Sequence, residues 1–239
     1  MTAVDFPNQK ILFQKKRHNN MQRFFDIFFS GFALLLLSPF FLPVMIVLKI
    51  TGEREIFYIQ ERIGKDGKPF GLYKFATMLK NSPNIGAGDI TLKNDSRVLP
   101  VGRFLRKTKI NELPQLLNII RGDMSIVGPR PMVSKTYKQY GNAGKDVYTI
   151  RPGLTGIGSI VFRDEERYLE NRSDPMKFYV ESIIPYKIQL ELWYKKNKSL
   201  LMYFTIIFLT AWIVIFSDSR LHHNIFKDLP EKPDSLNIT

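Results

Sequence analysis

The sequence predicts a membrane-associated α/β domain that is mainly helical, with a small antiparallel hairpin and an N-terminal re-entrant membrane helix. Three observations predict this class: two long uncharged apolar runs, a pair of β-prone segments around a turn, and a formal net charge of +13 over 239 residues. Apolar residues make up 44% of the chain, which excludes disorder for most of it. The absence of cysteine excludes disulfide scaffolds and thiolate zinc sites.

The first apolar run, over residues 27–48, contains no charged side chain and is long enough to cross a bilayer. Apolar side chains would occupy every face of this helix, which is typical of a membrane element. Ser38-Pro39 in its middle predicts a kink or break, because proline removes a backbone donor. Basic residues flank both ends, and positive charge marks the cytoplasmic side. We therefore expect a re-entrant helix over 21–50, after a basic tail over 1–20.

The second uncharged run, over residues 199–217, is barely long enough to span, since a helix rises about 1.5 Å per residue. It could span the membrane, lie in the interface or pack on the domain. We expect an apolar interfacial or membrane helix here, followed by a polar, loose tail over 218–239. Residues 51–198, between the two membrane elements, are expected to form one cytoplasmic domain that carries the excess positive charge.

Local signals predict the elements of this domain in order. Residues 56–76 predict a hairpin, because two β-prone segments flank the turn signal Asp66-Gly67. Asn111 is predicted to cap the next long helix, and Gly122 is a suitable residue to end it. The remaining expected elements are helices over 98–107, 132–141 and 175–197, loops over 81–96 and 151–156, and a rigid turn over 128–131.

Charged residues gather at the start of the helix that Asn111 is expected to cap. Glu112 lies next to it, Arg106 precedes it, and Arg130 stands between two prolines. Because helix N-termini attract anions and arginine binds phosphate bidentately, this pattern favours metal-assisted phosphoryl transfer. The alternative is structural, with Glu112 stabilising the helix dipole and Arg130 paired with Asp123 or Glu112. Further candidate phosphate ligands are Lys74, Arg97 and Arg151, and further candidate acids are Asp95, Asp123, Asp164, Glu165 and Glu166.

Several ordered motifs include these residues. They are Arg23-x-x-Asp26, Ser38-Pro39, QERIGKDGKPFGLYKFATM (60–78), NDSRVLPVGRFLRKTKINELPQ (94–115), GDMSIVGPRP (122–131) and RPGLTG (151–156). In this order and spacing they resemble the bacterial sugar transferase family, the small monotopic polyprenyl-phosphate phosphoglycosyl transferases. The resemblance covers residues from about 21 to 160.

The resemblance implies a protein at the cytoplasmic face of the bacterial inner membrane, with Arg23 and Asp26 fixing a re-entrant helix that breaks at Ser38-Pro39. It implies transfer of a sugar 1-phosphate from a UDP-sugar to undecaprenyl phosphate, with release of UMP, as the first membrane step of surface glycan synthesis. It also implies Mg²⁺ as cofactor, with Glu112 as the metal contact. Membrane lipids are expected partners, and a homo-oligomer is left open. Nucleic acid is not an expected partner, because the sequence has no helix-turn-helix, zinc-finger or RNP pattern.

The sequence departs from the family pattern at three places. Family members use an Asp-Glu pair whose Asp attacks the sugar-linked phosphate, but Asn111 stands in that position, and a neutral amide is a poor nucleophile. Glu112 could be the nucleophile or support direct transfer, another acid such as Asp123 could reach the phosphate, or the protein could bind nucleotide-sugar or lipid phosphate without catalysis. We expect activity centred on Glu112. At the position of Ala76, family members often have arginine. At residues 156–159, which are Gly-Ile-Gly-Ser in this sequence, many members have an Ala-Gln pair. The second half of the chain is therefore expected to recognise a different sugar from those members.

Overall fold

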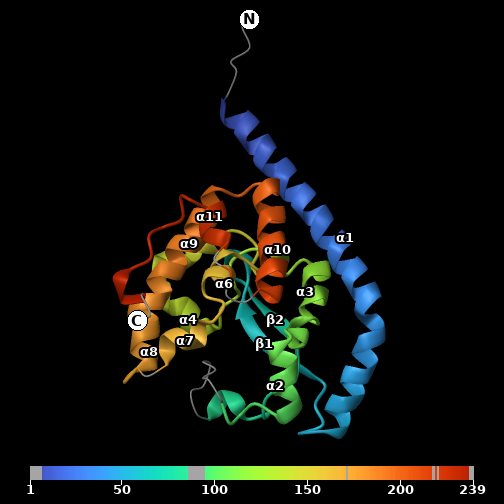
Figure 1. The fold of residues 1–239 in the computed structure, drawn as a ribbon. Helices are drawn as coiled ribbons and strands as arrows, with labels where there is room; N and C mark the ends of the chain where they lie inside the picture. The colour runs from blue at the N-terminus through green and yellow to red at the C-terminus, as the bar shows by residue number, and fades with distance from the viewer. Residues whose placement is uncertain (1–6, 86–94, 171, 217–218, 220, 237–239) are drawn as a thin grey trace, which may run out of the picture.

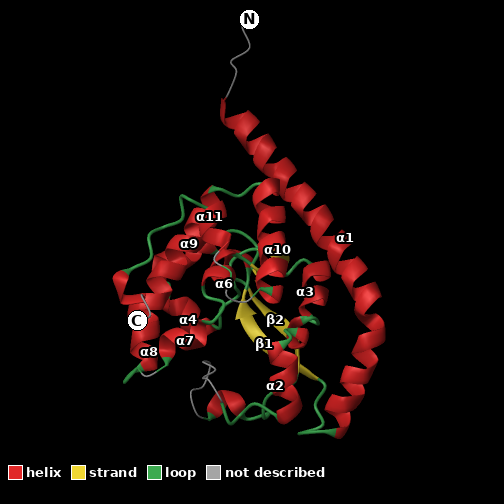
Figure 2. Cartoon of the chain, viewed as in Figure 1, coloured by secondary structure: helices red, strands yellow, loops and turns green. Residues whose placement is uncertain are grey.

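The computed structural model describes residues 7–85, 95–170, 172–216, 219 and 221–236, with the backbone alone for residues 7–18 and Pro83. A long helix runs along one side of a body in which shorter helices surround two small sheets (Figures 1 and 2). The elements are α1 (Pro7–Ile50), β1 (Phe57–Ile63), β2 (Pro69–Phe75), α2 (Pro100–Lys107), α3 (Gln115–Arg121), β3 (Ser125–Val127), α4 (Ser134–Gln139), α5 (Gly141–Val147), β4 (Gly153–Thr155), α6 (Ile157–Val161), α7 (Glu165–Leu169), α8 (Pro175–Phe178), α9 (Ile184–Lys196), α10 (Leu200–Ile215) and α11 (Leu221–Ile225), with short helical turns η1 (Lys65–Gly67), η2 (Ser82–Asn84), η3 (Ile110–Glu112), η4 (Tyr179–Ile183) and η5 (Asp234–Leu236). The mainly helical class with a small hairpin is confirmed. Residues 1–6 of the predicted basic tail and residues 86–94 of the predicted loop lie outside the described residues.

The predicted hairpin is confirmed. Strands β1 and β2 pair antiparallel from Phe57–Phe75 to Ile63–Pro69, and the turn contains Asp66 and Gly67, both with positive φ. A second sheet was not predicted: β3 pairs in parallel with β4, where the sequence indicated a loop. Three-residue strands are too short to show alternation, so this pairing depends on tertiary contacts that the local sequence does not reveal.

Helix α1 is continuous through Ser38-Pro39, and Figure 1 shows it bending along the body without turning back. Of the predicted kink or break, the break is therefore not seen, and the kink stays a prediction. The Ser38 hydroxyl donates to a carbonyl of the preceding turn at 2.8 Å. Residues 7–20, expected to be a tail, are helical as well. Within the described residues, the one helix long and apolar enough to cross a membrane covers Asn19–Ile50, and only 6% of its most apolar stretch is buried. The re-entrant path stays a prediction.

The Arg23-x-x-Asp26 motif joins α1 to the body. The Asp26 carboxylate, 1% exposed, accepts hydrogen bonds from the Ile126 backbone N–H at 2.9 Å and from the Ser125 and Tyr203 hydroxyls at 3.0 Å. The Arg23 guanidinium donates to two carbonyls in the last turn of α3. Charged side chains within an apolar helix are therefore used to fix α1 against α3, β3 and α10.

Replacing Asp26 with alanine is expected to lower the free energy of unfolding by about 3 kcal/mol, because three donors lose their acceptor in a buried environment. Thermal unfolding of the purified protein in detergent would measure the loss. Glu61→Ala, which removes an exposed carboxylate on β1, is the matched control and should change stability little. Equal unfolding temperatures for the two variants would contradict this role of Asp26.

Helix α10 is two-sided. Tyr203, Ile206 and Leu209 are buried against the body, whereas Leu201 and Ile215 are 79% and 73% exposed. An apolar face that the body leaves uncovered fits an interfacial helix, which stays a prediction.

The expectation of a loose tail after α10 is wrong for its described part, residues 219 and 221–236. This segment forms α11 and η5, and it buries Phe226 and Leu236 against the body. The Tyr186 hydroxyl donates to the Pro230 carbonyl at 3.0 Å, which ties the segment to α9. A few apolar residues spaced among polar ones are enough to anchor it, and such spacing gives no periodic signal.

Candidate functional site

A cleft of about 1570 Å³ lies between the hairpin, α2, η3 and the wall formed by α6, α7 and α9. It brings together five of the candidate catalytic and phosphate-binding residues: Lys74, Arg106, Asn111, Glu112 and Arg130. Four of the candidate acids line it as well: Asp95, Asp164, Glu165 and Glu166. It does not include Arg97, Arg151 or the membrane-element residues Arg23, Asp26, Ser38 and Pro39. Residues from the hairpin, from η3 and from the turn after β3 therefore converge on one side of the cleft.

Glu112 is a partly buried, ionised carboxylate in this cleft. It lies in η3, not in the first turn of α3, which begins at Gln115. Its Oε1 lies 3.5 Å from Nη2 of Arg130. Burial alone would raise the pKa of Glu112, but the charges of Arg130, Lys74 and Lys109 outweigh burial and lower the pKa to about 2. The carboxylate is thus charged throughout the physiological pH range.

Asn111 does not cap α3 as predicted, because η3 and Pro114 intervene before that helix begins and no side chain caps it. The Asn111 side chain is 6% exposed and lines the cleft. Its Oδ1 has no hydrogen-bond partner among the described residues. A buried carbonyl oxygen without a partner is costly, so this atom is suited to a ligand or a cation.

The oxygen atoms of Glu112 and Asn111 fit Mg²⁺, which binds one or two protein oxygen ligands together with substrate phosphates. Within the described residues, no group of three or more His, Cys, Asp or Glu side chains could hold a metal. Phosphate oxygens would therefore have to complete the coordination, which is the arrangement common in phosphoryl-transfer sites.

Lys74 and Arg130 supply cations beside Glu112. Burial and the charge of Arg62 lower the pKa of Lys74 from 10.5 to about 7, although Glu112 opposes this change. The charge of Glu112 raises the pKa of Arg130, so the guanidinium is always charged. Lys74 is therefore the cation whose charge changes near neutral pH.

The affinity for UDP is expected to fall about tenfold as the pH rises from 6 to 9, because Lys74 loses its proton above its pKa of about 7. Calorimetric titration of UDP across this range would measure the fall. Lys74→Arg is the control, since arginine stays charged and its affinity for UDP should change with pH only through the ionisation of UDP itself. Identical pH profiles for the two proteins would rule out a role for Lys74 in the wild-type dependence.

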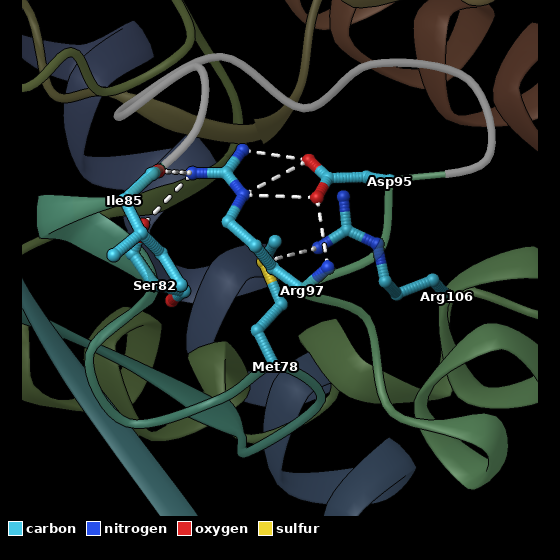
Figure 3. A network of polar contacts seen from close by, with 6 residues as sticks. All are labelled: Met78, Ser82, Ile85, Asp95, Arg97 and Arg106. Carbon is cyan, nitrogen blue, oxygen red and sulfur yellow. Dashed lines mark hydrogen bonds and ion pairs between the residues drawn. The ribbon is translucent and has the colours of Figure 1, made fainter.

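Arg97 does not line the cleft, and its guanidinium makes contacts within the protein. Its guanidinium, 3% exposed, pairs with Asp95 at 2.6 Å and donates to the carbonyls of Ser82 and Ile85 (Figure 3). Figure 3 also shows Arg106 beside this group. Arg97 thus holds together the two ends of the segment from 82 to 97, next to the cleft rather than inside it.

Two other candidate residues, Arg151 and Asp123, do not line the cleft. Arg151 Nε donates to the Gly122 carbonyl at 2.9 Å, at the end of α3. Asp123, proposed as an alternative nucleophile, accepts a hydrogen bond from Asn118 at 3.2 Å. Neither side chain lines the cleft, so Asp123 is not placed to replace the missing carboxylate at position 111.

The opposite wall contains functional candidates that the sequence indicated weakly or not at all. Lys187 on α9 is 5% exposed and pairs with Glu165 of α7 at 2.5 Å. Glu191, also 5% exposed, lies one turn further along α9, and burial raises its pKa from 4.5 to about 7. The sequence suggested a solvated helix face at 164–166. The available signal was the spacing of Lys187 and Glu191, which are four residues apart and therefore lie on one face of α9.

Comparison with known proteins identifies the family. The family model described as bacterial sugar transferase matches residues 17–217. The chain belongs to the bacterial sugar transferase family. The match begins in α1 and ends just after α10, so the apolar part of α1, the whole of α10 and the residues that line the cleft lie within it.

Three curated relatives illustrate the family. The exopolysaccharide production protein ExoY of Rhizobium meliloti is 40% identical over 161 residues, which cover 62% of this chain and 71% of the relative. The undecaprenyl-phosphate galactose phosphotransferase of Salmonella typhimurium is 34% identical over 85% of this chain and 42% of the relative. The UDP-glucose:undecaprenyl-phosphate glucose-1-phosphate transferase of Klebsiella pneumoniae is 34% identical over 80% of this chain and 39% of the relative. The chain thus spans less than half of the last two relatives.

Proposed function

We propose that this protein transfers a sugar 1-phosphate from a UDP-sugar to undecaprenyl phosphate and releases UMP, as the first membrane step of surface polysaccharide or glycoconjugate synthesis. The observation that carries the proposal is the ionised Glu112 beside Arg130 and Lys74 in one cleft. The names of the relatives support the sugar phosphate and the polyprenyl acceptor.

The proposed chemistry uses Glu112 in one of two ways. In the first, a Glu112 oxygen bonds to the β-phosphorus, the bond from that phosphorus to the bridging oxygen breaks, and UMP leaves with the electron pair. An oxygen of undecaprenyl phosphate then attacks the same phosphorus and restores the carboxylate. In the second, the acceptor attacks directly while Glu112 orients the site. Arg130 and Lys74 neutralise the phosphate charge in both. Mg²⁺, for which Glu112 and Asn111 Oδ1 would be the protein ligands, would add to that neutralisation.

The proposed location is the cytoplasmic face of the bacterial inner membrane. The apolar surface of α1 and the uncovered face of α10 support it, because both require an apolar environment. The acceptor would then reach the basic cleft by diffusion within the same leaflet.

UMP release by the purified protein in nanodiscs tests the proposal. The reactions would contain Mg²⁺, undecaprenyl phosphate and, one at a time, UDP-glucose, UDP-galactose, UDP-N-acetylglucosamine or UDP-N-acetylgalactosamine. We expect acceptor-dependent UMP and a lipid-linked sugar phosphate from one donor. Omitting the acceptor separates the two chemistries, since only covalent attack by Glu112 gives a burst of UMP that matches the enzyme concentration. Binding of a UDP-sugar without UMP from any donor would contradict transfer.

A second candidate is a catalytically silent protein of the same fold that binds nucleotide-sugar or lipid phosphate. The observation that favours it is Asn111, an amide with an unpartnered Oδ1 at the position where the resemblance implies a nucleophilic carboxylate. It predicts tight binding of UDP-sugar with no UMP at any acceptor concentration.

A further inference from the structure

Glu191 has an unusual environment in the wall of the cleft. The backbone N–H groups of Gly158 and Arg130 donate to its carboxylate. A Cβ at position 158 would lie 2.5 Å from Glu191 Oε1, so a larger residue there would displace the Glu191 carboxyl group. The other oxygen, Oε2, is buried and has no hydrogen-bond partner among the described residues. The backbone therefore fixes one oxygen of the carboxyl group and leaves the other without a partner.

The neighbours of Glu191 form a compact polar group. Lys187 lies one helical turn away and pairs with Glu165, and its Nζ lies 5.2 Å from the ring centres of Phe162 and Tyr179. All five side chains line the cleft. This end of the cleft thus contains a hydrogen-bond acceptor, a cation and two aromatic rings close to one another.

The position of this group relative to Arg130 indicates which part of a donor it meets. Glu191 contacts the backbone of Arg130, whose guanidinium faces Glu112 and is the proposed phosphate ligand. In a UDP-sugar, the sugar is bonded directly to the β-phosphate, so its ring hydroxyls lie next to whatever binds that phosphate. Hydroxyls donate to carboxylate oxygens and accept from ammonium groups, so they match Glu191 and Lys187.

We propose that Glu191 Oε2, supported by Lys187, accepts a hydrogen bond from a ring hydroxyl of the donor sugar and thereby selects among UDP-hexoses. The proposal rests on the proposed function and adds the residue that recognises the sugar. A site that holds a substrate hydroxyl with a buried polar group rejects an analogue that cannot supply it, because the protein group is then left unpaired.

Binding of UDP and of UDP-sugars to Glu191→Gln tests the proposal by calorimetry, without turnover. The probes are UDP, UDP-glucose, UDP-galactose, UDP-N-acetylglucosamine and UDP-N-acetylgalactosamine. We expect the wild-type protein to bind one sugar nucleotide more tightly than UDP, and Glu191→Gln to weaken that complex about tenfold without changing the affinity for UDP. Glu181→Gln, which changes an exposed acid of η4, is the matched control and should leave both affinities unchanged.

Three results would overturn the proposal. Glu191→Gln could weaken the binding of UDP and of the UDP-sugar equally, which would place Glu191 at the nucleotide, or it could change neither affinity. The third is a wild-type protein that binds no sugar nucleotide more tightly than UDP. If Glu191→Gln unfolds at a lower temperature than the wild type, Gly158→Ala replaces it, since the added Cβ would displace Glu191 Oε1 and is expected to weaken only UDP-sugar binding. A wild type that shows the expected binding but releases no UMP would contradict the transferase and still support the sugar subsite.

Discussion

Replacing Glu112 with glutamine is expected to reduce the rate of UMP release on the order of 10³-fold. The substitution keeps the side-chain shape but removes the ionised carboxylate that Arg130, Lys74 and Lys109 hold at a pKa of about 2. Covalent attack by this side chain is lost, and its binding of a cation is weakened because an amide oxygen carries no charge. Steady-state UMP release with the preferred donor and undecaprenyl phosphate would measure the loss.

The affinity for UDP in the absence of Mg²⁺ separates loss of chemistry from loss of binding. Glu112 competes with phosphate for Arg130 across 3.5 Å, so Glu112→Gln should bind UDP at least as tightly as the wild type. Glu61→Gln, on the exposed side of β1, is the control for loss of an acidic residue. Product formation above a tenth of the wild-type rate would show that Glu112 is not the central residue.

Local sequence signals were sufficient to predict those elements whose residue pattern lies within the element itself. The hairpin followed from its turn at Asp66-Gly67, and the end of α3 followed from Gly122, whose φ is 96°. The cap at Asn111 was wrong because a 3-10 turn and Pro114 delay the start of α3. The parallel pairing of β3 with β4 brings together segments far apart in the chain, and no local pattern encodes it.

The candidate site was predicted on one side only. Glu112 and Arg130 belong to two neighbouring motifs, residues 94–115 and 122–131, so motif and charge both indicated them. Glu165 and Lys187 are separated by 22 residues and form a pair only because α7 packs against α9. The spacing of Lys187 and Glu191 marks one face of α9 but does not reveal its partner, and the acidic run around Glu165 has the composition of a solvated surface.

Replacing Asn111 with aspartate is expected to raise the rate of UMP release about tenfold or more. The three cations that keep Glu112 ionised surround the same turn, so they can hold a second carboxylate partly ionised despite its neighbour. The unpartnered Oδ1 of Asn111 would become an anionic oxygen with no donor to lower its nucleophilicity. Acceptor-free UMP bursts of wild type and variant, compared at equal enzyme concentration, would measure the gain.

The double variant Asn111→Asp/Glu112→Gln decides which carboxylate forms the bond to phosphorus. If Asp at position 111 attacks, the double variant keeps a UMP burst, although Mg²⁺ is held less tightly without Glu112 and a higher concentration is needed. If Glu112 attacks, Asn111→Asp adds a second carboxylate close to it, raises the pKa of one of the two, and slows release at pH 6 more than at pH 8. A rate for Asn111→Asp below that of the wild type at every pH would contradict the expected gain. It would indicate that the chain has adapted to an amide at this position, with direct transfer or silent binding as its function.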